Sequence, residues 1–177
     1  MRLSKEADYN YRNKTLVPPP PIEYDLRPSN YCNLECVMCS PHSSSSIQER
    51  IEQVVPSSGI DNFHIKPNKA KYRSGVDYIN YLKQNINRVQ SLQFAGGEPF
   101  LMPEVIEFIQ WLYETKNSSH IDIRFLTNGT VFRSKWIDYL LSFRNVVINI
   151  SLDGTGSVLE YVRFPNKWNN VQKKGGS

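Results

Sequence analysis

The sequence has 177 residues, of which 40% are hydrophobic and 12% aromatic, so it can bury the core of one globular domain. Its 21 Lys and Arg residues against 17 Asp and Glu residues give a net charge of +4, a balance too even to argue for a nucleic-acid-binding protein. No apolar run is long enough to span a membrane, and the first residues lack the apolar stretch of a secretion signal.

The N-terminal part of the chain predicts an extended arm. Residues 1–17 are polar without a clear period, and the prolines at 18–21 favour a stiff polyproline segment. Residues 22–27 then have the pattern of a short strand, which leads into a loop at 29–40. We therefore expect an arm over residues 1–21 and the start of the folded domain at residue 22.

The loop after this strand contains the only three cysteines of the chain, Cys32, Cys36 and Cys39. An odd number of cysteines cannot be paired off completely in disulfides. Three thiolates on one loop can bind three irons of a [4Fe-4S] cluster and leave the fourth iron open for chemistry. A structural zinc site of the Cys3His type is the alternative, because His42 follows Cys39 by three residues. Clustered free thiols without an export signal favour a cytoplasmic location.

The region after the cysteine loop predicts two helices separated by a loop. Ser46 and Glu49 fit a capping box at the start of a helix from Ile47 to about Val55. Residues 56–75 are rich in Pro, Ser, Gly, Asn and Lys, which is typical of a loop. Apolar residues at helical spacing predict a second helix within 76–89.

Strands and helices alternate over the rest of the chain. Apolar or alternating patterns predict strands at 92–95, 121–125 and 146–151. Helical spacing predicts helices at 103–113, 135–143 and 157–163. Together with the strand at 22–27, this alternation predicts an α/β fold with about four parallel strands.

Polar or glycine-rich motifs follow the predicted strands directly. Residues 96–99 (Gly-Gly-Glu-Pro) follow the second strand, Asn128 and Gly129 follow the third, and Ser151 ends the fourth. In parallel α/β folds the carboxyl ends of the strands form the active-site edge. Each motif alone is also a common turn signal, so it is their shared position with the cysteine loop that points to a site.

The cysteine spacing followed by Gly-Gly-Glu-Pro on the next strand resembles the radical SAM superfamily, over roughly residues 22–171. The segment at 32–44 looks most similar to the twitch branch of that superfamily. The resemblance implies a (β/α) barrel, here partial, that binds S-adenosylmethionine (SAM) at the open iron. It also implies reductive cleavage of SAM to a 5′-deoxyadenosyl radical, which abstracts hydrogen from a substrate that the sequence does not identify.

The resemblance further implies a set of SAM contacts at the carboxyl ends of the strands. In this set Gly96, Gly97 and Glu98 face the amino group, and Asn128 reaches the ribose. Ser151 and Arg163 hold the carboxylate. The backbone around Met38 in the cysteine loop faces the adenine. The implied contacts are Gly96, Gly97, Glu98, Asn128, Ser151, Arg163 and Met38.

Four predicted strands are fewer than the six of the family's usual barrel. The last strand is then an open edge, which invites pairing with a partner chain. We divide the sequence into an arm (1–21), a core-like domain (22–171) and a flexible tail (172–177). A radical SAM enzyme also requires a reducing electron donor of the flavodoxin or ferredoxin type. The alternative function is a non-catalytic metal-binding scaffold, or a decayed relative that acts through a partner.

Overall fold

The computed structural model of the protein describes residues 20–54 and 76–175. Most of the predicted N-terminal arm and the predicted loop at 56–75 lie outside the described residues. One parallel sheet in the order β1-β2-β3-β4 confirms the predicted α/β class and its four strands. These strands are β1 (Glu23–Leu26), β2 (Ser91–Phe94), β3 (Asp122–Thr127) and β4 (Asn145–Ile150).

The helices fall close to their predicted positions, with shifts at their ends. Those between the strands are α2 (Ser45–Val54), α3 (Val76–Gln84), α4 (Pro103–Glu114) and α5 (Lys135–Leu140), with short 3-10 turns η2 (Ile86–Arg88) and η3 (Pro99–Leu101). After β4 come α6 (Gly156–Val162) and α7 (Trp168–Gly175). The sequence analysis predicts α6 but not α7, and it assigns residues 172–175, which belong to α7, to a flexible tail.

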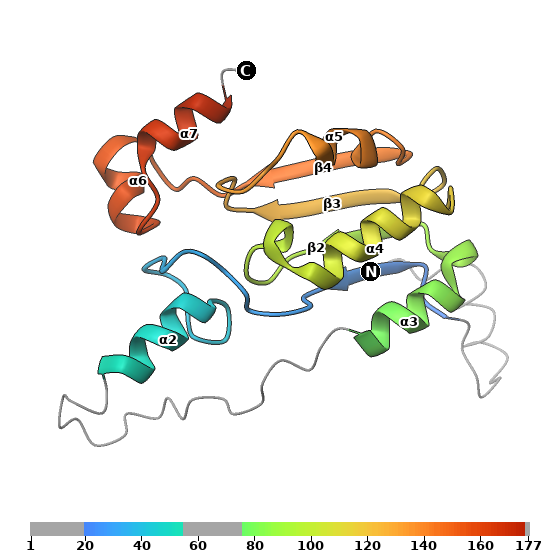
Figure 1. The fold of residues 1–177 in the computed structure, drawn as a ribbon, viewed down its shortest axis with the longest axis horizontal. Coiled ribbons are helices and arrows are strands. Elements are labelled where there is room, and N and C mark those ends of the chain that lie inside the picture. The colour runs from blue at the N-terminus through green and yellow to red at the C-terminus, as the bar shows by residue number, and fades with distance from the viewer. Residues whose placement is uncertain (1–19, 55–75, 176–177) are drawn as a thin grey trace, which may run out of the picture.

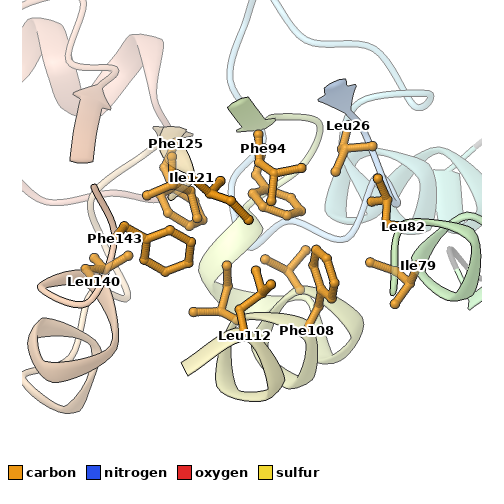
Figure 2. Packing of buried hydrophobic residues seen from close by; sticks show 14 of the residues in the cluster. Leu26, Ile79, Leu82, Phe94, Phe108, Leu112, Ile121, Phe125, Leu140 and Phe143 are labelled. Carbon is orange, nitrogen blue, oxygen red and sulfur yellow. The ribbon is translucent and has the colours of Figure 1, made fainter. Parts of the chain in front are cut away.

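One face of β1, β2 and β3 is covered by helices and forms the core (Figure 2). Alternation along β3 puts Ile123 and Phe125 on this face, with 1% and 0% of their surface exposed. Their neighbours on α4 are Phe108 and Leu112, which repeat at helical spacing and are fully buried. Each fully buried side chain of this size stabilises the fold by about 1.5–3 kcal/mol. The core thus fixes how the strands line up, and with them their carboxyl ends.

The other face of the sheet is open in the part of the chain that the structure describes. Arg124 and Leu126 of β3 point to this face and are exposed. On β4, residues of both faces are exposed, including Ile148, which pairs with the buried Phe125. The sheet therefore ends in an apolar strand whose outer edge no described element covers.

Candidate functional site

The site lies beyond the carboxyl ends of the strands. The strands are parallel, and the arrowheads of β3 and β4 in Figure 1 point to the side on which α6 lies. Backbone hydrogen bonds join the loops that follow β1 and β2: the Gly97 amide donates to the Ser29 carbonyl at 3.1 Å, and the Glu98 amide donates to the Tyr31 carbonyl at 2.8 Å. The predicted motifs of β1 and β2 are thus brought into direct contact.

The two glycines after β2 make this contact possible. A Cβ atom at Gly97 would lie 2.2 Å from the Tyr31 carbonyl oxygen, and one at Gly96 would lie 2.7 Å from the Ser29 carbonyl oxygen. Gly96 also has a φ of +103°, which side chains of L-residues rarely tolerate. In the structure, therefore, the backbone of the cysteine loop is what requires both glycines. Their predicted contact with SAM stays a prediction.

All three cysteines are free thiols on the loop between β1 and α2. Cys36 is buried, whereas Cys32 and Cys39 are partly exposed. The Cys39 amide donates to the Cys36 carbonyl at 2.9 Å, so the segment between them is a tight turn. The loop carries its sulfurs on a compact backbone that neighbouring elements hold from two sides.

On one side the serines at the start of α2 hold the loop. Ser45 Oγ accepts from the Cys32 amide at 3.2 Å, and Ser46 Oγ donates to the Cys32 carbonyl at 2.8 Å. Ser44 Oγ donates to the Leu34 carbonyl at 2.5 Å and accepts from the Ile47 amide at 3.3 Å, so Ser44 caps the helix. The prediction of Ser46 as the cap is wrong, because its hydroxyl bonds to the cysteine loop instead.

On the other side the end of α6 holds the loop. The Glu35 amide donates to the Phe164 carbonyl at 2.6 Å, and the Val37 amide donates to the Val162 carbonyl at 3.0 Å. Between these two bonds, Arg163 Nη1 lies 3.8 Å from Cys36 Sγ, and the guanidinium also pairs with Asp153. Arg163 therefore lies beside a cysteine. Its predicted contact with the SAM carboxylate stays a prediction.

The cysteine sulfurs lie in a partly desolvated place with polar donors nearby. Burial raises the pKa of the Cys36 thiol to about 11, although the Arg163 charge opposes the shift. Burial likewise raises the pKa of Cys32, and there the Asn128 amide nitrogen lies 3.9 Å from Sγ and opposes the shift. Such donors suit thiolates that bind metal, since hydrogen bonds to the sulfurs tune an iron–sulfur cluster.

The three free thiols of this loop are a donor set that fits a [4Fe-4S] cluster, since each iron of a cluster takes one thiolate. Among residues 20–54 and 76–175, no three His, Cys, Asp or Glu side chains are gathered in a way that could hold a metal ion. Binding of a cluster by these thiols therefore stays a prediction, as does the zinc alternative. His42, the fourth ligand of the zinc alternative, is exposed.

Glu98 is completely buried and joins β2 to β3. One carboxylate oxygen accepts from Thr127 Oγ1 at 2.8 Å and from the backbone amide of Phe100 at 3.2 Å. The other accepts from the backbone amide of Asn128 at 2.7 Å. Burial raises its pKa, while these three bonds oppose the shift. The structure thus shows Glu98 as an internal link. Its predicted bond to the SAM amino group stays a prediction.

Asn128 follows β3 and is brought to the cysteine loop. Its side-chain amide donates to Asn33 Oδ1 at 3.0 Å and lies near Cys32 Sγ. Ser151 follows β4, and its amide donates to the Thr127 carbonyl at 2.9 Å, so it lies at the same edge. Met38 is 55% exposed at the tip of the cysteine loop. The structure therefore gathers the predicted residues at one edge of the sheet.

Several site residues were missed by the sequence analysis. Asn33 and Thr130 bond to one another at 2.9 Å across 97 positions of the chain. Asn33 stands between two cysteines and Thr130 just past a common turn signal, so neither carries a local site signal of its own. Both, like Ser44 and Ser45, are small polar residues that look like ordinary loop residues until the fold gives them partners.

A hollow of about 220 Å³ lies on the α2 side of the cysteine loop. Its lining is shared between the cysteine loop, α2 and the end of η3. It consists of Tyr31, Cys32, Asn33, Ser45, Ser46, Glu49 and Leu101.

No helix of the described residues is both long and apolar enough to cross a bilayer.

Comparison with known proteins gives matches over most of the chain. The model of the radical SAM superfamily matches residues 26–173. The radical SAM cyclopropyl synthase TigE of Paramaledivibacter caminithermalis is 30% identical over 132 residues, which are 71% of this chain and 25% of TigE. The uncharacterized protein MJ0907 of Methanocaldococcus jannaschii is 24% identical over 131 residues, 73% of this chain and 37% of that protein. The chain spans roughly a quarter to just over a third of the length of these relatives.

Solved structures share the fold. SuiB of Streptococcus suis bound to its precursor peptide SuiA superposes with a TM-score of 0.57 and 17% sequence identity, covering 96% of this chain and 32% of SuiB. SuiB bound to S-adenosylmethionine gives the same TM-score and identity and is covered to 33%. The open four-stranded sheet thus corresponds to part of a larger barrel.

Proposed function

Because this chain belongs to the radical SAM superfamily, whose members carry out SAM-dependent radical chemistry, we propose that it binds a [4Fe-4S] cluster through Cys32, Cys36 and Cys39. The observation that carries the proposal is the direct contact between the cysteine loop and the Gly-Gly-Glu motif at the active-site edge. When bound, the cluster supplies the electron that cleaves SAM reductively and yields the 5′-deoxyadenosyl radical. Assignment to the twitch branch stays a prediction.

The residues of this chain would hold the cluster and SAM in fixed positions. Cys36, buried beneath α6, anchors the centre of the loop, and Arg163 places positive charge beside its sulfur. By the family resemblance, Gly96, Gly97 and Glu98 at the end of the neighbouring strand would face the SAM amino group. A fixed arrangement suits radical chemistry, because a loosely held radical reacts with whatever it meets.

We further propose a peptide as the substrate class. Support comes from SuiB, which shares the fold and has been solved with a precursor peptide. In this chain the sheet face opposite the helices is open among the described residues and is bordered by the apolar strand β4.

A flavodoxin- or ferredoxin-like protein would supply the electron that reduces the cluster before SAM is cleaved.

An electron paramagnetic resonance spectrum of the anaerobically reconstituted, reduced protein tests the cluster and SAM together. We expect a cluster signal that shifts when SAM is added, because SAM then binds the open iron. A signal that does not shift would contradict SAM binding by this chain. One zinc per chain, in place of iron with matching sulfide, would contradict the cluster and support the scaffold alternative.

A further inference from the structure

Three side chains close a ring of hydrogen bonds between the cysteine loop and the end of β3. The Asn128 amide nitrogen donates to Asn33 Oδ1 at 3.0 Å, and Asn33 Nδ2 donates to Thr130 Oγ1 at 2.9 Å. Thr130 Oγ1 completes the ring by donating to Asn128 Oδ1 at 2.7 Å. Each side chain donates once and accepts once within the ring, so the bonds polarise one another in the same sense.

The ring is anchored on the β3 side by bonds that do not involve the cysteine loop. The backbone amide of Asn128 donates to the buried Glu98 carboxylate at 2.7 Å, and the backbone amide of Thr130 donates to Asn128 Oδ1 at 2.9 Å. Asn128 is itself 6% exposed. The ring therefore starts from a rigid support that reaches back to β2, and Asn33 is the part that attaches to it.

Asn33 directly follows Cys32, and this places the first sulfur. The side-chain nitrogen of Asn128, Nδ2, which bonds to Asn33, also lies 3.9 Å from Cys32 Sγ. The backbone of Cys32 is held from α2 by Ser45 and Ser46, but those bonds reach its amide and carbonyl and leave the side chain to other contacts. The ring ties the Cys32 side of the loop to the end of β3, in addition to the backbone bonds from Gly97 and Glu98 that hold residues 29–31 at the end of β2.

We propose that Asn33 and Thr130 are positioning residues for Cys32, holding its sulfur at the place where the cluster binds. The ligand role of Cys32 rests on the proposed function, whereas the positioning can be measured without metal or SAM. Thr130 has a defined part, because its single hydroxyl must accept from Asn33 and donate to Asn128 at once. Valine has the same shape and can do neither.

The test measures the alkylation rate of each cysteine in the metal-free, reduced full chain, by mass spectrometry with iodoacetamide as the probe. In Thr130→Val we expect Cys32 to react about threefold to tenfold faster, because loss of the ring lets the loop open more often. Cys36 and Cys39 should keep their rates. Thr130→Ser, which retains the hydroxyl, should restore the wild-type rate.

Asn33→Ala should have the same selective effect and covers the case in which Thr130→Val fails to fold. Thr115→Val is the matched control, since Thr115 Oγ1 also accepts from an asparagine, Asn117, at 2.9 Å, but on an exposed turn after α4. An unchanged rate at Cys32 in both ring variants would overturn the proposal. An equal rise at all three cysteines would also overturn it, because it would show general loosening. These outcomes are independent of the cluster signal that tests the proposed function.

Discussion

The cysteine loop and the strand β4 are held in opposite ways. The loop at 29–40 has almost no regular structure, yet α2, α6 and the ends of β2 and β3 all hydrogen-bond to it. β4 is a regular strand, yet all six of its residues are exposed among the described part of the chain. Among the described residues, hydrogen bonds from several elements thus hold the polar loop, whereas the apolar β4 pairs with β3 alone.

The largest effect is expected from Cys36→Ala. Because Cys36 is the buried central thiol of the loop, its loss should abolish a stable [4Fe-4S] cluster. Iron and sulfide content after anaerobic reconstitution measures this directly. Ile150→Ala on the exposed edge is the control and should leave both contents unchanged. Full iron and sulfide in Cys36→Ala would show that the ligands lie elsewhere.

A matched pair of isoleucines sharpens the contrast in packing. Ile123 on β3 is 1% exposed, and Ile148 on β4 is 36% exposed. We expect Ile123→Ala to lower the free energy of unfolding by about 2–5 kcal/mol. Ile148→Ala should cost about 1 kcal/mol, because its side chain loses less buried surface. Denaturant unfolding gives both values, and equal losses would show that β4 is covered in solution by another part of the protein or by a second chain.

Removal of the buried carboxylate should weaken the link between β2 and β3. Glu98→Ala leaves the Asn128 amide and the Thr127 hydroxyl without their acceptor, which should lower the free energy of unfolding by about 2–3 kcal/mol. It should also weaken SAM binding, because the end of β3 loses its support. Glu107→Ala, on the exposed side of α4, is the control. Unchanged stability in Glu98→Ala would contradict the link.

The smallest effect concerns pH. Burial raises the pKa of Glu98 above its ordinary value of 4.5, so the folded protein retains a proton that the unfolded chain has already released. Its contribution to stability is therefore fully present below pH 4.5 and is lost as the pH rises through the folded-state pKa. The difference in unfolding free energy between wild type and Glu98→Gln should fall over this range. A difference that rises with pH would mean that the three hydrogen bonds outweigh burial.

Regular elements and the cysteine motif could be predicted because their signals are local. Apolar alternation in β3 and helical spacing in α4 encode their own periods, and a buried face follows from each. The spacing of the cysteines likewise identified the loop as a candidate cluster site before any fold was known. Parallel pairing then followed from the alternation of strands and helices, since a parallel sheet requires crossover connections.

The partners of the polar side chains were decided only by the tertiary structure. Ser46 looks like a helix cap from its neighbours in sequence, but the fold brings the Cys32 carbonyl within reach and leaves the cap to Ser44. Thr130 and Asn33 are 97 positions apart, so no local pattern could pair them. A short polar side chain bonds to whatever the fold places about 3 Å away. The sequence by itself therefore determined the fold class and put three thiols on one loop, and the packing of distant loops determined which residues contact that loop.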